Sequence, residues 1–137
     1  METIAVVLRQ PEQIELNRLA LTPPTADDVV VDVDWSGVST GTERLLWSGR
    51  MPPFPGMGYP LVPGYESVGR VVEAGTATGL HPGQRVFVPG AKCFGEVRGL
   101  FGASASRLVA TAKRVVPLDQ NLGERGILLA LAAKIGR

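Results

Sequence analysis

The chain has 137 residues, a formal net charge of +1 and 45% hydrophobic residues, which predicts about one globular domain that buries its own core. The balanced charge argues against a nucleic-acid-binding protein, and no apolar run is long enough to span a membrane. Cys93 is the only cysteine, so no internal disulfide can form. The N-terminus lacks the features of a signal peptide, and we expect a cytoplasmic protein. Nothing in the sequence indicates an oligomeric state.

The first third of the chain predicts β-strands. Short β-branched runs at Thr3–Leu8 and Ile14–Leu19 are expected to pair with each other. Val29–Trp35 alternates in hydrophobicity, which predicts a half-buried strand. Its expected buried face holds Val29, Val31, Val33 and Trp35, and its other face holds Val30, Asp32 and Asp34.

A short helix is predicted next. Thr40–Glu43 fits a capping box, in which a Thr side chain and a Glu three residues later satisfy free N–H groups. We expect the helix to start near Thr40, to cover Glu43–Trp47 and to stop at Gly49. This interpretation gives Thr40 and Glu43 a capping role, with a catalytic role as the alternative.

Met51–Pro63 is rich in proline and glycine and is not expected to form a regular element. It nevertheless carries Phe54, Met57 and Tyr59. One interpretation is a loop whose apolar residues cover the core. The other is an ordered wall that binds a large apolar substrate, because prolines reduce the entropy that a loop loses on binding.

The rest of the chain predicts further short strands separated by turns, at Ser67–Ala74, Arg85–Val88, Ala105–Thr111 and Arg114–Pro117. Many short strands with short helices predict a mainly β, β-barrel-like domain.

The last predicted element is a helix over Glu124–Ala133. We expect residues 1–133 to form one domain and residues 134–137 to be left over from cloning. No glycine-rich motif for a dinucleotide or a phosphate is present.

The candidate chemistry lies in two short segments that carry hydroxyl and carboxylate groups, Ser39–Glu43 and Tyr65–Glu66. Oxidation of an alcohol requires a group that accepts or relays the hydroxyl proton. Glu66 is the candidate base, with Tyr65, Ser39 or Thr40 as hydrogen-bonding partners. The alternatives are a structural ion pair for Glu66 and a core position for Tyr65.

Metal chemistry is not expected, because a zinc site needs three or four Cys, His or carboxylate ligands. The chain offers only Cys93 and His81 as soft ligands. We expect His81 to be a solvated turn residue. Cys93 is either a buried apolar residue or a residue beside the cleft.

Four segments carry a resemblance to a known family: Gly37-Val38-Ser39, Gly64-Tyr65-Glu66, Gly69–Gly75 and Gly83–Val86. They resemble the catalytic domain of medium-chain dehydrogenases/reductases, the alcohol-dehydrogenase-like family. Zinc-containing members have a Cys where this chain has Ser39 and a His where it has Tyr65. The resemblance therefore implies the zinc-less branch of the family, which Ser39–Arg44 marks.

The resemblance implies a GroES-like β-barrel domain that works with NAD, which is bound mainly by a second, dinucleotide-binding domain that this chain lacks. The stretches Ser39–Gly75 and Val88–Phe94 are similar to the branch that acts on tetrapyrroles in bacteriochlorophyll synthesis. That similarity implies oxidation of a 1-hydroxyethyl group to acetyl, with the macrocycle against Phe54, Met57 and Tyr59. The alternatives are a zinc-less reductase for a quinone or sugar, or a non-catalytic GroES-like binding module.

Overall fold

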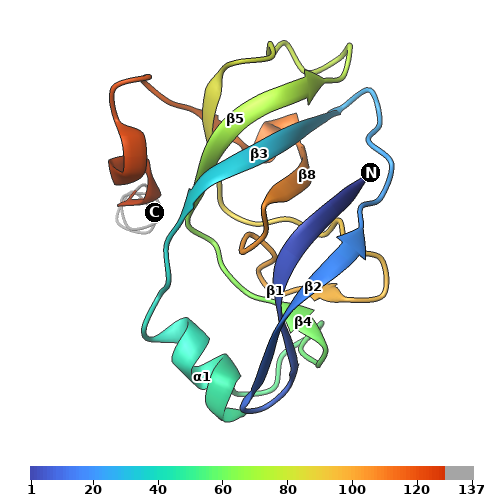
Figure 1. Ribbon diagram of the computed structural model, residues 1–137, viewed down its shortest axis with the longest axis vertical. Coiled ribbons are helices and arrows are strands. Elements are labelled where there is room, and N and C mark those ends of the chain that lie inside the picture. The colour runs from blue at the N-terminus through green and yellow to red at the C-terminus, as the bar shows by residue number, and fades with distance from the viewer. Residues whose placement is uncertain (129–137) are drawn as a thin grey trace.

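The computed structural model describes residues 1–128, which form two β-sheets and one short α-helix (Figure 1). One sheet has the strand order β2-β1-β4-β7 and the other has the order β8-β3-β5-β6-β9. The predicted mainly β fold is confirmed. The strands are β1 (Glu2–Gln10), β2 (Gln13–Ala20), β3 (Asp28–Ser36), β4 (Leu61–Val62), β5 (Ser67–Ala74), β6 (Arg85–Val88), β7 (Arg98–Gly99), β8 (Arg107–Thr111) and β9 (Val116–Pro117).

The predicted N-terminal strand pair is confirmed as the antiparallel hairpin of β1 and β2. Its register runs from Glu2 opposite Ala20 to Leu8 opposite Ile14. Leu8 also lies opposite Leu61 of β4, so β1 occupies the interior of the four-stranded sheet. Within residues 1–128, no helix is both long and apolar enough to cross a membrane.

Strand β3 lies inside the five-stranded sheet and pairs with both β5 and β8. The predicted alternation is wrong here, because Val29, Val30 and Val31 are all completely buried in the main core. A register shift in the pairing with β5 falls between Val30 and Val31 and breaks the two-residue repeat. Trp35, which was expected inside, is 48% exposed.

Helix α1 spans Thr42–Ser48, and Gly49 ends it in the left-handed conformation at φ 75°. The predicted capping box of Thr40 and Glu43 is wrong. The N-cap is Gly41, which has helical backbone angles, and not Thr40. The helix therefore begins one residue later than a cap at Thr40 would give. The N–H of Thr42 points to Ser39 Oγ at 3.4 Å, and Ser39 rather than Thr40 serves the helix start.

The regions without predicted regular structure contain short elements. The Met51–Pro63 segment ends in β4, which pairs with β1 and, in parallel, with β7. Only two residues of the predicted strand at Arg114–Pro117 form β9, since Ala112–Arg114 is a 3-10 helix. A second 3-10 helix covers Gly123–Leu128. The rest of the helix predicted to Ala133, and residues 134–137, lie outside the described residues.

Candidate active site

An apolar cavity of about 580 Å³ lies between the β1–β2 hairpin and α1. Figure 1 shows α1 beside the turn of this hairpin at one end of the molecule. The N–H of Glu12 in that turn donates to the carbonyl oxygen of Trp47 at 2.8 Å and holds the two elements together. The cavity is lined by Val6, Leu8, Ile14, Val38, Thr40, Glu43, Arg44, Trp47, Pro63 and Ser104.

Gly64 shapes the inner wall of this cavity. It has a φ of 96°, which favours glycine, and a Cβ at this position would meet Ser104 Oγ at 2.2 Å. The N–H of Ser104 donates to the carbonyl oxygen of Pro63 at 3.0 Å. The glycine therefore lets two segments that are distant in sequence close the cavity together.

Glu43 enters the cavity from the first turn of α1. Its Oε2 atom is buried and has no hydrogen-bond partner among residues 1–128. Burial raises the pKa of the Glu43 carboxyl, and the charge of Glu66 raises it further, whereas hydrogen bonding to the backbone of Ser39 and Glu43 opposes this rise. Glu43 is thus a carboxyl group that loses its proton less readily than an exposed glutamate does.

Glu66 packs against the backbone of Gly37. A Cβ on Gly37 would meet Glu66 Oε2 at 2.3 Å, and the Gly37 N–H donates to the Glu66 carbonyl oxygen at 2.7 Å. No ion pair of Glu66 is found in the described part of the chain, which leaves the ion-pair alternative without a partner there.

Tyr65 combines a core position with a place in the polar cluster. Its ring packs edge-on against Phe101, with centroids 5.3 Å apart, and also contacts the buried Val68 and Phe87. Its hydroxyl lies 3.3 Å from Thr42 Oγ1. Because the N–H of Thr42 reaches Ser39 Oγ, Ser39, Thr42 and Tyr65 form one connected polar group at the start of α1.

The structure therefore brings the predicted catalytic residues into one neighbourhood but gives them different positions. Thr40 lines the cavity, while Ser39, Tyr65 and Glu66 are not part of its described lining. Sequence reasoning assigned Glu43 to capping and did not find Ser104 at all. Position 104 carries no local signal, because only the folding of the chain places it beside Gly64.

Phe54, Met57 and Tyr59 of the predicted substrate loop are not part of the described lining of this cavity, although Pro63 at the end of the loop is. Met57 and Tyr59 are partly buried against a small core cluster of Leu8, Leu46 and Leu61. The Tyr59 hydroxyl donates to the carbonyl oxygen of Leu46 in α1. Phe54 is 37% exposed. Substrate contact by Phe54, Met57 and Tyr59 stays a prediction.

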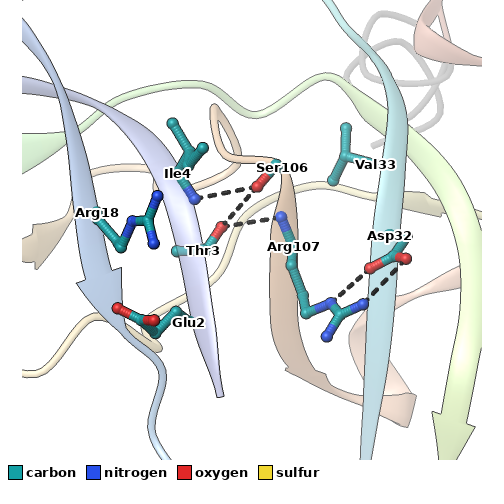
Figure 2. Close-up of a pocket in the computed structure, with 8 residues that line it drawn as sticks. All are labelled: Glu2, Thr3, Ile4, Arg18, Asp32, Val33, Ser106 and Arg107. Atoms are coloured by element: carbon teal, nitrogen blue, oxygen red, sulfur yellow. Dashed lines mark hydrogen bonds and ion pairs between the residues drawn. The ribbon is translucent and has the colours of Figure 1, made fainter.

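A second cavity, of about 460 Å³, opens between the two sheets. Figure 2 shows Arg107 of β8 held by two hydrogen bonds to Asp32 of β3, at 2.6 and 3.1 Å. Thr3 Oγ1 accepts the N–H of Arg107, and Ser106 Oγ accepts the N–H of Ile4. These polar groups fasten β1 to β8, so we assign them a structural role.

Cys93 and His81, the two candidate metal ligands, do not form a metal site in the described residues. Cys93 is buried, and burial raises the pKa of its thiol to about 11, which confirms the buried alternative. His81 is exposed in a turn, as predicted, and its backbone N–H donates to Gln84 Oε1. Among residues 1–128, no three His, Cys, Asp or Glu residues are grouped so that they could hold a metal ion.

Residues 25–120 match the sequence profile of the alcohol dehydrogenase GroES-like domain. The chain belongs to this family. The resemblance noted in the sequence is thereby confirmed at the level of the family, and so is the expected GroES-like fold. The cavity and the polar cluster lie within or beside the matched region of this GroES-like domain.

Curated relatives of the domain carry a specific name. A 2-desacetyl-2-hydroxyethyl bacteriochlorophyllide A dehydrogenase from Rhodobacter capsulatus is 58% identical over 97% of this chain. A dehydrogenase of the same name from Cereibacter sphaeroides is 55% identical over 97% of it. The chain spans 43% of the length of each relative.

Solved structures agree on the fold. An Escherichia coli oxidoreductase/dehydrogenase of unknown specificity superposes with a TM-score of 0.76 and 22% sequence identity. The match covers 97% of this chain and 45% of that one. This chain thus shares its fold with just under half of the length of that structure.

Proposed function

We propose that this GroES-like domain is the catalytic part of an NAD-dependent dehydrogenase that oxidises the 1-hydroxyethyl group of bacteriochlorophyllide a to acetyl. The observation that carries the proposal is the 58% identity over 97% of the chain to a dehydrogenase of that name. The large apolar cavity beside a polar cluster suits an extended apolar substrate with one reacting alcohol. A cytoplasmic location is part of the proposal, and the single cysteine favours it.

The chain's own residues would manage the proton of the alcohol. Glu66 acts as the base or positions it, and Ser39, Thr40 and Tyr65 supply hydrogen-bonding groups. Phe54, Met57 and Tyr59 are proposed to contact the macrocycle from the Met51–Pro63 loop. Because hydroxyl groups stand at Ser39 and Tyr65, the donor set does not fit zinc, which prefers thiolate and imidazole ligands.

The nicotinamide cofactor supplies the acceptor for the hydride of the alcohol carbon. The residues described here do not fit its binding site, because the only parallel strand pair among them is the two-residue pairing of β4 and β7. A dinucleotide site needs a glycine-rich turn between a parallel strand and a helix. We therefore propose that the cofactor is held mainly by a second domain. The GroES-like domain alone should then not oxidise the substrate.

The test is to follow the visible absorption of 3-hydroxyethyl bacteriochlorophyllide a with NAD and a full-length protein that carries this domain. We expect the spectrum to change to that of the acetyl pigment as NADH forms. The isolated domain should shift the pigment spectrum on binding without producing NADH. Reduction of a quinone by NADH, or turnover of a sugar, in place of pigment oxidation would favour the other zinc-less reductases. Pigment binding without any turnover by the full-length protein would favour a binding module.

A further inference from the structure

The least explained polar group of the molecule is the carboxyl of Glu43. It lines a mostly apolar cavity, and its Oε2 is buried without a hydrogen-bond partner in residues 1–128. Leaving a charged group buried and unpaired costs free energy of folding. Arg44 also lines the cavity, but no ion pair between Arg44 and Glu43 occurs in the described residues. Such a group needs a reason other than stability.

We propose that Glu43 is a catalytic residue whose carboxylate accepts the proton of the substrate hydroxyl in the cavity beside Val38, Thr40 and Trp47. This inference rests on the proposed function and names the residue that meets the reacting alcohol. The O–H proton passes to the carboxylate of Glu43, and the electron pair of that bond becomes the second bond of the new carbonyl group. A nicotinamide cofactor held by the proposed second domain would supply the acceptor for the hydride, so that the alcohol would become a ketone.

Position distinguishes Glu43 from Glu66. Glu66 packs over Gly37 and is not part of the described lining of the cavity, whereas Glu43 is. Burial is the main cause of the raised pKa of Glu43 and the charge of Glu66 adds to it, so Glu66 affects the reaction through the pKa of Glu43. A carboxylate with a raised pKa is a better proton acceptor near neutral pH than an ordinary one.

The other groups that face Glu43 support this assignment. The hairpin side of the cavity presents the apolar side chains of Val6, Leu8 and Ile14, which offer no charge. Arg44 is the other charged residue of the described lining, and the hydroxyl of Tyr65 approaches α1 through Thr42. The pH dependence of the reaction should therefore follow the ionisation of Glu43.

The first test compares Glu43→Gln, Glu66→Gln and the control Glu96→Gln in the full-length protein, since Glu96 is exposed and outside the cavity. Glu43→Gln should lower kcat by about a hundredfold or more and remove the acidic limb of the pH–rate profile. Glu66→Gln should keep that limb but move it to lower pH, because the charge that raises the pKa of Glu43 is gone. Glu96→Gln should match the unsubstituted protein.

A folded Glu43→Gln protein that keeps its rate and its acidic limb would overturn the inference. Thermal unfolding of each variant verifies that it is folded.

A second readout does not depend on turnover. In the full-length protein labelled with ¹³C at glutamate carboxyls, the Glu43 resonance should move on addition of 1-phenylethanol, and the Glu96 resonance should not. If the protein oxidises 1-phenylethanol but not the pigment, the proposed substrate fails while Glu43 remains the alcohol contact. If the chemical shift of Glu43 does not change when the alcohol is added, the inference about Glu43 is wrong for any substrate.

Discussion

Among single residues, the buried carboxyl of Glu43 predicts a pH-dependent stability difference. Its pKa in the folded protein is raised above the ordinary value of 4.5, so its contribution to stability is full below that value and is lost as the pH rises through the folded pKa. Glu43→Gln should therefore raise the free energy of unfolding at pH 8 by about 1 kcal/mol and change it little at pH 4. Urea unfolding of both proteins at the two pH values measures this. A loss of stability at pH 8 would show that the carboxylate is well paired.

Cys93 predicts slow chemical modification. Its thiol is buried, its Sγ accepts the N–H of Val109 at 3.5 Å, and its pKa is raised from 9.0 to about 11. The thiolate is the reactive form, so a shift of this size reduces alkylation at pH 8 by roughly a hundredfold relative to the unfolded chain. Mass spectrometry after iodoacetamide treatment, with and without urea, measures the two rates. Equal rates would mean that the thiol is accessible in the folded protein.

The sequence allowed the polar cluster to be predicted because its members are close along the chain, in Ser39–Glu43 and Tyr65–Glu66. Their individual positions were not predictable in the same way. A capping box of Thr40 and Glu43 requires Thr40 at the N-cap, whereas Gly41 occupies that position and Glu43 lines the cavity. Ser104 reaches the cavity through long-range contacts with Pro63 and Gly64, and such contacts leave no local pattern.

At the scale of elements, the Met51–Pro63 loop predicts two different outcomes for two aromatic residues. Phe54 is 37% exposed, so Phe54→Ala should weaken pigment binding by roughly 1–3 kcal/mol and leave the melting temperature unchanged. Tyr59→Phe removes the hydrogen bond to Leu46 and should lower stability by about 1 kcal/mol. Absorption titration with bacteriochlorophyllide and thermal unfolding separate the two effects.

The contradicting outcome for the loop is also specific. If Phe54→Ala binds the pigment normally and melts much lower, the loop only covers the core cluster of Leu8, Leu46 and Leu61. The wall of the substrate site would then lie elsewhere.

Most strands were predictable as elements because their β-branched runs are bounded by turns, as in β1, β2, β5 and β6. The side-chain pattern of β3 was not, since alternation assumes an unbroken register with one solvent face. A register shift and cover on both faces make three consecutive valines interior. Two-residue strands such as β4 and β7 exist only through their partners, so no local propensity indicates them.

For the whole molecule, the donor set predicts that the purified protein contains no stoichiometric zinc. Ser39 and Tyr65 present neutral hydroxyl groups where zinc-dependent relatives are expected to present a thiolate and an imidazole. Elemental analysis of protein purified without chelators measures the metal content. The double variant Ser39→Cys, Tyr65→His is the matched comparison, and it should bind more zinc than the unsubstituted protein. Stoichiometric zinc in the unsubstituted protein would contradict the prediction.

Strand β2 lies at the open edge of its sheet, with β1 on one side only, and Leu16 on it is 73% exposed. An edge of this kind is a template on which a strand of another chain can add. Charged and polar side chains lie on this strand. Arg9 of β1 donates hydrogen bonds to Glu15 and Asn17 of β2 and forms an ion pair with Glu15. These side chains therefore protect the protein from aggregation more than they stabilise its fold. Replacing them with apolar residues would leave the fold intact and turn the hairpin into a seed for aggregation.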